Sequence, residues 1–150
     1  MTATNHALTG AIIGLTIAGP WALALAFFSH FVLDSIPHYS DQKLEYAPKK
    51  FAVLLSMQAL SCLLLVVFLG IVHTENWILP SVCAFLATAP DFMWAPKFFR
   101  SLKNKNKNKV TGTNLILKFH GKIQWFERPI GIVVEVFWAI GAISILAILI

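Results

Sequence analysis

The chain has 150 residues, of which 57% are hydrophobic and 13% are charged, and its formal net charge is +5. Together with a mean hydropathy of +0.71, this composition excludes an ordinary soluble domain and indicates an integral membrane protein. The length accommodates about five spans of roughly 20 residues each. We therefore expect residues 1–150 to form a single all-α membrane domain, a compact bundle of about five transmembrane or membrane-embedded helices.

The first two apolar segments predict a helical hairpin. One helix is expected at about residues 6–18, where Gly10 and Gly14 have the G-x-x-x-G spacing that permits close helix contact. The pair Gly19-Pro20 breaks this helix, and a second one is expected at about residues 21–36. Both segments are short for a full span, so they could thin the bilayer locally or end partway across it.

The remaining apolar segments predict three more helices and one interfacial helix. Between them lie polar segments, of which the lysine- and asparagine-rich stretch Lys103–Lys109 is too polar to pack into a core and is expected to be a solvated loop. Leu115, Phe119 and Phe126 recur at helical spacing beside lysines, which is typical of an amphipathic helix lying at the membrane surface. The expected ranges are about 51–72, 77–89 and 129–150 for the membrane helices and about 114–127 for the interfacial helix.

The distribution of basic residues predicts the topology. All 12 Lys and Arg residues fall between Lys43 and Lys50 or between Lys97 and Arg128, and such windows are usually cytoplasmic. The N-terminus is then inside and the C-terminus outside. Because no Lys or Arg precedes Lys43, the first segment lacks the basic region of a signal peptide and is expected to be retained.

The segment His30–His38 carries the first candidate metal ligands. His30 and Asp34 are four residues apart, which places imidazole and carboxylate on one face of a helix. Pro37 ends or kinks that helix, so His38 can turn back toward the same point. Both side-chain types bind zinc. The alternative interpretation is a histidine at a helix end that is simply hydrogen-bonded to a neighbouring carboxylate.

The predicted topology brings further metal-ligand residue types from other segments to the same membrane level. His6, Asp91 and His120 are additional candidate ligands, although His6 and Asp91 could instead cap helices and His120 could belong to an ordinary polar face. Glu135 and Glu127 are the candidate catalytic bases. Glu135 lies inside an apolar helix, where an ionised group needs a partner, a cation or water, although it could also snorkel or stay protonated. Glu127 could instead pair with Arg128.

At this level of detail the chain resembles a known family. The resemblance rests on His6 with Leu8-Thr9-Gly10, the His30-x-x-x-Asp34-x-x-Pro37-His38 block, Pro90-Asp91 and His120. They resemble the inner-membrane-bound, metal-dependent hydrolase family described as LexA-regulated hydrolases. Its histidine and aspartate pattern is similar to that of zinc-dependent phospholipase C and P1-type nuclease. The chain departs from the family pattern at Met93, where a second aspartate is usual, and at Gln124-Trp125, where a second histidine is usual.

The resemblance implies a bacterial-type inner (plasma) membrane protein with a zinc site that cleaves phosphate esters. We expect a divalent metal, Zn²⁺ first, to activate water near the cytoplasmic face for hydrolysis of a phosphoester, which could be a small molecule or derived from a lipid. Membrane lipids are the expected partners, and no nucleic acid is expected. The alternatives are a metal-ion or proton conduit and a non-catalytic structural membrane protein.

Overall fold

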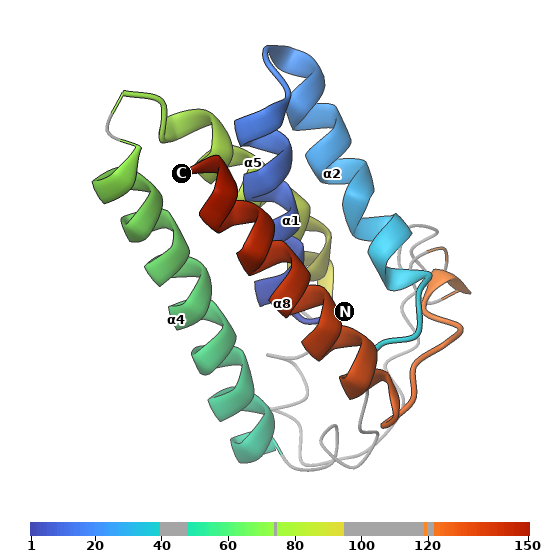
Figure 1. Ribbon diagram of the computed structural model, residues 1–150. Coiled ribbons are helices and arrows are strands. Elements are labelled where there is room, and N and C mark those ends of the chain that lie inside the picture. Colours follow the sequence, from blue (N-terminus) through green and yellow to red (C-terminus); the bar gives the residue numbers. More distant parts are fainter. Residues whose placement is uncertain (40–47, 74, 95–118, 120–121) are drawn as a thin grey trace.

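The computed structural model describes residues 1–39, 48–73, 75–94, 119 and 122–150. Within these residues the chain is helical, which confirms the all-α class. Figure 1 shows the helices as one bundle. The elements are α1 (Ala3–Thr16), α2 (Pro20–Asp34), α4 (Pro48–Val72), α5 (Ile78–Thr88), the 3-10 helix η1 (Ala89–Trp94) and α8 (Gly131–Leu149).

The helix ends differ from the expected ranges for local reasons. The first helix begins at Ala3 rather than near residue 6, because the carbonyl of Thr2 already accepts hydrogen bonds from the backbone of Asn5 and His6. The second ends at Asp34 rather than near residue 36, since the residue before Pro37 is disfavoured in helical conformation. The polar residues near the start of the first helix and near the end of the second therefore lie inside these helices or directly beside them.

The next two boundaries are set by proline and by the chain after Arg128. The fourth membrane segment ends as α-helix at Thr88 and continues as η1, because Pro90 has no N–H to continue the α-helical pattern. The last helix begins at Gly131, two residues after the expected start. The expected interfacial helix at 114–127 lies largely outside the described residues, and the expected solvated loop Lys103–Lys109 lies wholly outside them.

In the part of the chain that the structure describes, two helices are long and apolar enough to cross a membrane, namely Lys50–Val72 with 23 residues and Gly131–Leu149 with 19 residues. Both are mostly exposed on the outside of the bundle, unlike the core helix of a soluble protein. Helix α1 has 14 residues and is therefore about 21 Å long. That is shorter than the hydrocarbon core of about 30 Å, so this helix does not have the length of a full span.

Helix α1 is central and packs against α2, α4, α5 and α8. A Cβ atom on Gly10 would lie only 2.3 Å from the carbonyl oxygen of Cys83, and one on Gly14 would lie 2.4 Å from Cα of Pro80. The two glycines thus let the backbones of α1 and α5 approach closely, as their spacing predicts. This contact fixes His6, one turn before Gly10, relative to α5.

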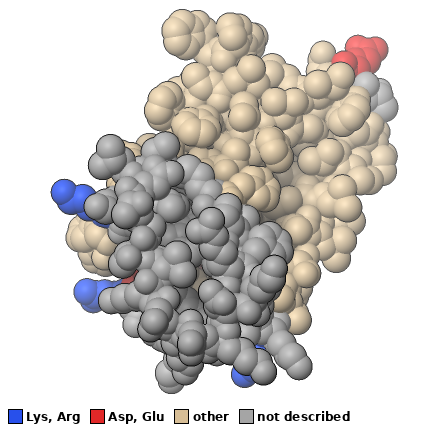
Figure 2. Space-filling model, turned by 180° about the vertical axis from the view of Figure 1, so that it is seen from behind, with Lys and Arg blue, Asp and Glu red and all other residues tan. Residues whose placement is uncertain are grey.

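The chemistry-bearing residues gather at one end of the bundle. Figure 1 shows the N-terminus, the end of α2 and the starts of α4 and α8 toward the same end, with the turn that follows α4 at the opposite end. Glu75 lies in that turn. On the face shown in Figure 2, acidic atoms of the described residues lie at the upper end and basic atoms lie along the left edge and at the bottom, and a band of tan surface without charged atoms lies between the upper end and the basic atoms. Such a band suits contact with lipid.

Candidate metal centre

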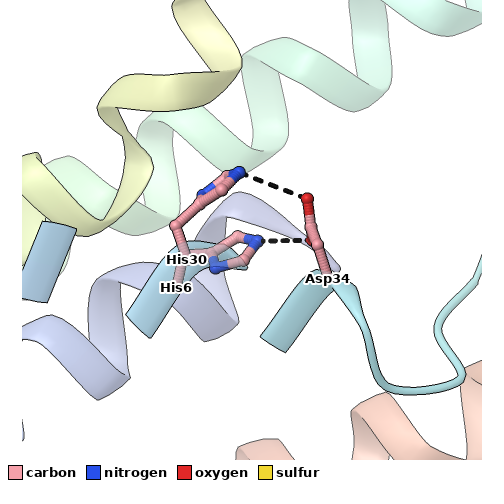
Figure 3. A group of neighbouring side chains, drawn as sticks. All are labelled: His6, His30 and Asp34. Atoms are coloured by element: carbon pink, nitrogen blue, oxygen red, sulfur yellow. Dashed lines mark hydrogen bonds and ion pairs between the residues drawn. The ribbon is translucent and has the colours of Figure 1, made fainter. Parts of the chain in front are cut away.

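Three buried residues from two helices form a group that can hold a metal ion. His6 comes from α1, and His30 and Asp34 lie one turn apart on α2. One ligand atom from each residue lies within 4.8 Å of the others. Figure 3 shows both imidazole rings turned toward the carboxylate of Asp34. The hairpin of α1 and α2 therefore places His6 next to the pair His30 and Asp34, which lie on one face of α2 and are 24 or more positions later in the chain.

The distances within this group suit a small metal ion. Nε2 of His6 lies 3.1 Å from Oδ1 of Asp34, and Nε2 of His30 lies 3.2 Å from Oδ2. In a tetrahedral zinc site with bonds of about 2.0–2.1 Å, neighbouring ligand atoms are about 3.3 Å apart. The same separations also suit direct N–H···O hydrogen bonds, so the protons on the two rings decide between these interpretations.

The proton arrangement on His30 favours a cation. Nδ1 of His30 lies 2.8 Å from the carbonyl oxygen of Ala87, and because a carbonyl can only accept, Nδ1 carries the proton of this hydrogen bond. In the neutral ring Nε2 then has a bare lone pair, and it faces the carboxylate of Asp34. A second proton on His30 or a metal ion would remove the repulsion between these two acceptors. Metal-binding histidines usually donate their other ring nitrogen in this way.

His6 is buried against His30, and one of its ring nitrogens has no partner among the described residues. Its ring stacks on that of His30 with centroids 4.1 Å apart, and its side chain is fully buried. Among the described residues, Nδ1 of His6 has no hydrogen-bond partner. A buried polar atom without a partner costs about 1–3 kcal/mol. The donor set of two imidazoles and one carboxylate is that of catalytic zinc sites with an open fourth position, so these residues fit the ion that the family resemblance implies.

Further polar groups surround Asp34 and His30. Gln124 donates from Nε2 to Oδ2 of Asp34 at 3.2 Å, and the amino group of Met1 contacts Oδ1. Oδ1 of Asp91, on η1, lies 3.7 Å from Nε2 of His30, and the Asp91 side chain is 36% exposed. Asp91 thus stands where the centre approaches the surface and can add a carboxylate to it.

His38 and Glu127 form a separate pair. Nε2 of His38 lies 3.6 Å from Oε1 of Glu127, and its Nδ1 donates to the carbonyl of Ile36 at 2.8 Å. The backbone of Arg128 donates to the carbonyl of His38 at 3.1 Å. The sequence motif suggested that His38 turns back toward His30 and Asp34, but the structure pairs it with Glu127. Pro37 ends the helix and directs His38 toward the segment that precedes α8.

Glu135 is buried, 3% exposed, and its carboxylate binds three donors of the protein. The backbone N–H groups of Thr2 and Tyr39 donate to it at 3.1 and 3.0 Å, and Nδ2 of Asn5 lies 3.4 Å away. Glu135 therefore joins α8 to the start of α1 and to the segment after α2. These are the two segments that carry His6 and His38.

Some contributors to the centre had no signal in the sequence. Ala87 acts through its backbone carbonyl, which no side-chain pattern reveals. In the sequence Gln124 stood out as a departure from the family pattern, and the structure shows its contact with Asp34. His120, a candidate ligand in the expected interfacial helix, lies outside the described residues.

Comparison with known proteins gives no relative for this arrangement. No family model, no curated protein and no solved structure matches the chain.

Proposed function

We propose that the chain is an integral membrane hydrolase that uses a divalent metal, Zn²⁺ first, to cleave a phosphoester. The observation that carries this proposal is the buried group of His6, His30 and Asp34, whose separations and proton arrangement suit a metal ion. The two long apolar helices support membrane insertion. The described basic residues Lys50, Lys122 and Arg128 adjoin the segments at the centre's end of the bundle, which supports a cytoplasmic site in an inner (plasma) membrane.

The protein's own residues would bind the ion, orient its ligands and shield it from bulk water. Two imidazoles and a carboxylate bind the ion, and the carbonyl of Ala87 fixes the orientation of the His30 ring. The buried ligands keep bulk water away from the ion on the side of α1 and α2. When bound, the metal supplies an activated water and stabilises charge on the phosphoryl oxygen.

We assign the general base to Glu127, with Glu135 in a positioning role. The Glu127 side chain is 37% exposed and faces His38, whereas the Glu135 carboxylate already accepts three hydrogen bonds. Gln124, three residues before Glu127, touches Asp34, so this segment borders the centre. In the reaction the water oxygen bonds to phosphorus, Glu127 takes the water proton, the ester P–O bond breaks, and Glu127 passes that proton to the departing alkoxide.

A metal or proton conduit is the second candidate, and the distribution of ionisable groups argues against it. A conduit needs such groups along the full membrane depth. In α4 and α8 the charged residues are Lys49 and Lys50, at the start of α4, and Glu135, one turn into α8. Beyond these positions neither helix contains a further Asp, Glu, Lys, Arg or His residue.

Hydrolysis by purified protein tests the proposal. Wild type, His30→Ala and His73→Ala are assayed with Zn²⁺ on bis(4-nitrophenyl) phosphate and on phospholipid in mixed micelles. His73 follows α4 at the far end of the bundle and serves as the matched control. We expect wild type and His73→Ala to hydrolyse at least one substrate and His30→Ala to lose this activity. Equal rates in all three proteins, or no hydrolysis by wild type, contradict the proposal.

A further inference from the structure

An apolar groove of about 340 Å³ runs along the bundle beside the candidate metal centre. Helix α1 forms one wall and α2 the other, and Trp138 of α8 contributes to the lining. The residues that define its course are Thr9 and Ile13 on α1, Ile17 directly after α1, Leu25 and Leu33 on α2, and Trp138 on α8.

The groove begins beside the ligands and leads away from them. Thr9 is one turn after His6, and Leu33 immediately precedes Asp34. From Thr9 to Ile17, and from Leu33 back to Leu25, each wall extends about 12 Å at a rise of 1.5 Å per residue. Because α1 and α2 are the two arms of a hairpin, both walls run in the same direction from the centre.

The lining offers hydrocarbon contact and little else. The Thr9 hydroxyl donates to the carbonyl of Asn5 at 2.9 Å and accepts from Nε1 of Trp138 at 3.0 Å. The Ser29 hydroxyl donates to the carbonyl of Ala26 at 2.7 Å. The polar groups at the groove are thus engaged within the protein. A peptide occupant would leave backbone groups without partners there, whereas an acyl chain needs none.

The surroundings identify the source of such a chain. Leu25, Phe28 and Val32 form an exposed apolar rim, and α8, which supplies Trp138, is one of the two helices long and apolar enough to cross a membrane. The volume is at the lower end of the roughly 300–1,000 Å³ that is typical of ligand pockets. It therefore suits one acyl chain rather than a whole lipid.

We infer that the groove holds one acyl chain of a membrane phospholipid and thereby presents the lipid's phosphate ester to the centre formed by His6, His30 and Asp34. This inference rests on the proposed function and names its substrate class. The groove supplies binding energy to a part of the substrate that does not react, so substrates without a long chain lose this contribution.

Photolabelling tests the groove independently of hydrolysis. The protein is placed in vesicles of phosphatidylethanolamine and phosphatidylglycerol that contain a phospholipid with a diazirine in its acyl chain. Labelled peptides are then mapped by mass spectrometry. We expect residues 9–17 and 25–33 to be labelled in excess over α4, which is also exposed to lipid. Leu25→Trp fills the groove and should reduce this excess labelling roughly tenfold. Leu63→Trp, at an exposed position on α4, should leave it unchanged.

A second groove variant guards against misfolding. If Leu25→Trp lowers thermal stability in detergent, Ile17→Trp, at the far end of the groove, replaces it. The inference is overturned if α4 and the groove helices are labelled equally. It is also overturned if both tryptophan variants on the groove leave the excess intact, because the lipid is then an ordinary boundary lipid.

Kinetics separates failure of the groove from failure of the proposed function. Leu25→Trp should lower kcat/KM for a long-chain phospholipid relative to kcat/KM for bis(4-nitrophenyl) phosphate, and Leu63→Trp should keep the wild-type ratio. An unchanged ratio in Leu25→Trp contradicts the inference. Excess labelling of the groove in a protein that hydrolyses neither substrate supports the lipid site while it overturns the hydrolase.

Discussion

The carbonyl oxygen of Ala87 accepts a hydrogen bond from Nδ1 of His30 at 2.8 Å, and this bond turns Nε2 of the same ring toward Asp34. It links α5 to α2 at the candidate metal centre. Because α5, which carries none of the three ligands, is itself held against α1 by the contact at Gly10, the position of His30 depends on the same helix packing that places His6. This coupling leads to testable consequences for both metal binding and stability.

Removal of the metal should lower the stability of the protein, and this effect should require Asp34. A ligand that binds only the folded state at 100 times its Kd stabilises it by about 2.7 kcal/mol. A chelator should therefore lower the Tm of wild type measured in detergent by differential scanning fluorimetry. In Asp34→Asn the chelator should have no effect, and in Glu75→Gln, an acidic position at the far end, it should act as in wild type. A chelator shift that survives in Asp34→Asn would place the metal elsewhere.

Gly10→Ala should destabilise the bundle, because the new Cβ would lie 2.3 Å from the carbonyl oxygen of Cys83. Overpacking of this kind costs about 1–3 kcal/mol. Gly141→Ala is the matched control, since a Cβ there has no neighbour within 4 Å and should be neutral or stabilise α8 by up to about 1 kcal/mol. Unfolding titrations with sodium dodecyl sulfate in mixed micelles measure both variants. Equal stabilities would mean that α1 and α5 are further apart.

Glu135→Gln should lower stability more than Glu127→Gln does. An amide replaces one acceptor oxygen of Glu135 with an N–H donor, which then faces Thr2 or Tyr39 donors, and a buried donor without a partner costs about 1–3 kcal/mol. Glu127 is partly exposed, and the same change there should stay within about 0.5 kcal/mol. Hydrolysis should fall in Glu127→Gln. If Glu135→Gln retains full stability and loses hydrolysis, Glu135 is the base.

Membrane topology is accessible to cysteine labelling in a background without Cys62 and Cys83. A cysteine at position 106, within the basic window, should be protected from an impermeant maleimide added to intact cells, and a cysteine at position 75 should react. Permeabilised cells, in which both should react, provide the control. The reverse pattern in intact cells would place the metal centre on the outer side of the membrane.

The sequence was sufficient to predict the helices and one part of the centre. Apolar length and the breaks at Gly19-Pro20 and Pro37 indicated the bundle, because local composition determines these features. The pair His30 and Asp34 followed from helical periodicity, which is also local. The close contact at Gly10 and Gly14 was indicated by their spacing, although the partner helix α5 was not.

Contacts between segments were harder to predict. His38 was grouped with His30 because both lie near one helix end, yet the direction of the chain after Pro37 depends on the backbone bond from Arg128. Glu135 was considered as a base because it is an isolated acid in an apolar helix. Its partners are backbone N–H groups from distant segments, and sequence patterns do not display these.

Elemental analysis of the purified protein tests the central claim most directly. Inductively coupled plasma mass spectrometry should find about one equivalent of a divalent transition metal in wild type, in His38→Ala and in His73→Ala. The same measurement should find little metal in His6→Ala and in His30→Ala, provided that circular dichroism shows both variants to be folded. Wild type without bound metal, or a metal content that is unchanged in folded His6→Ala and His30→Ala, would contradict a metal centre formed by His6, His30 and Asp34.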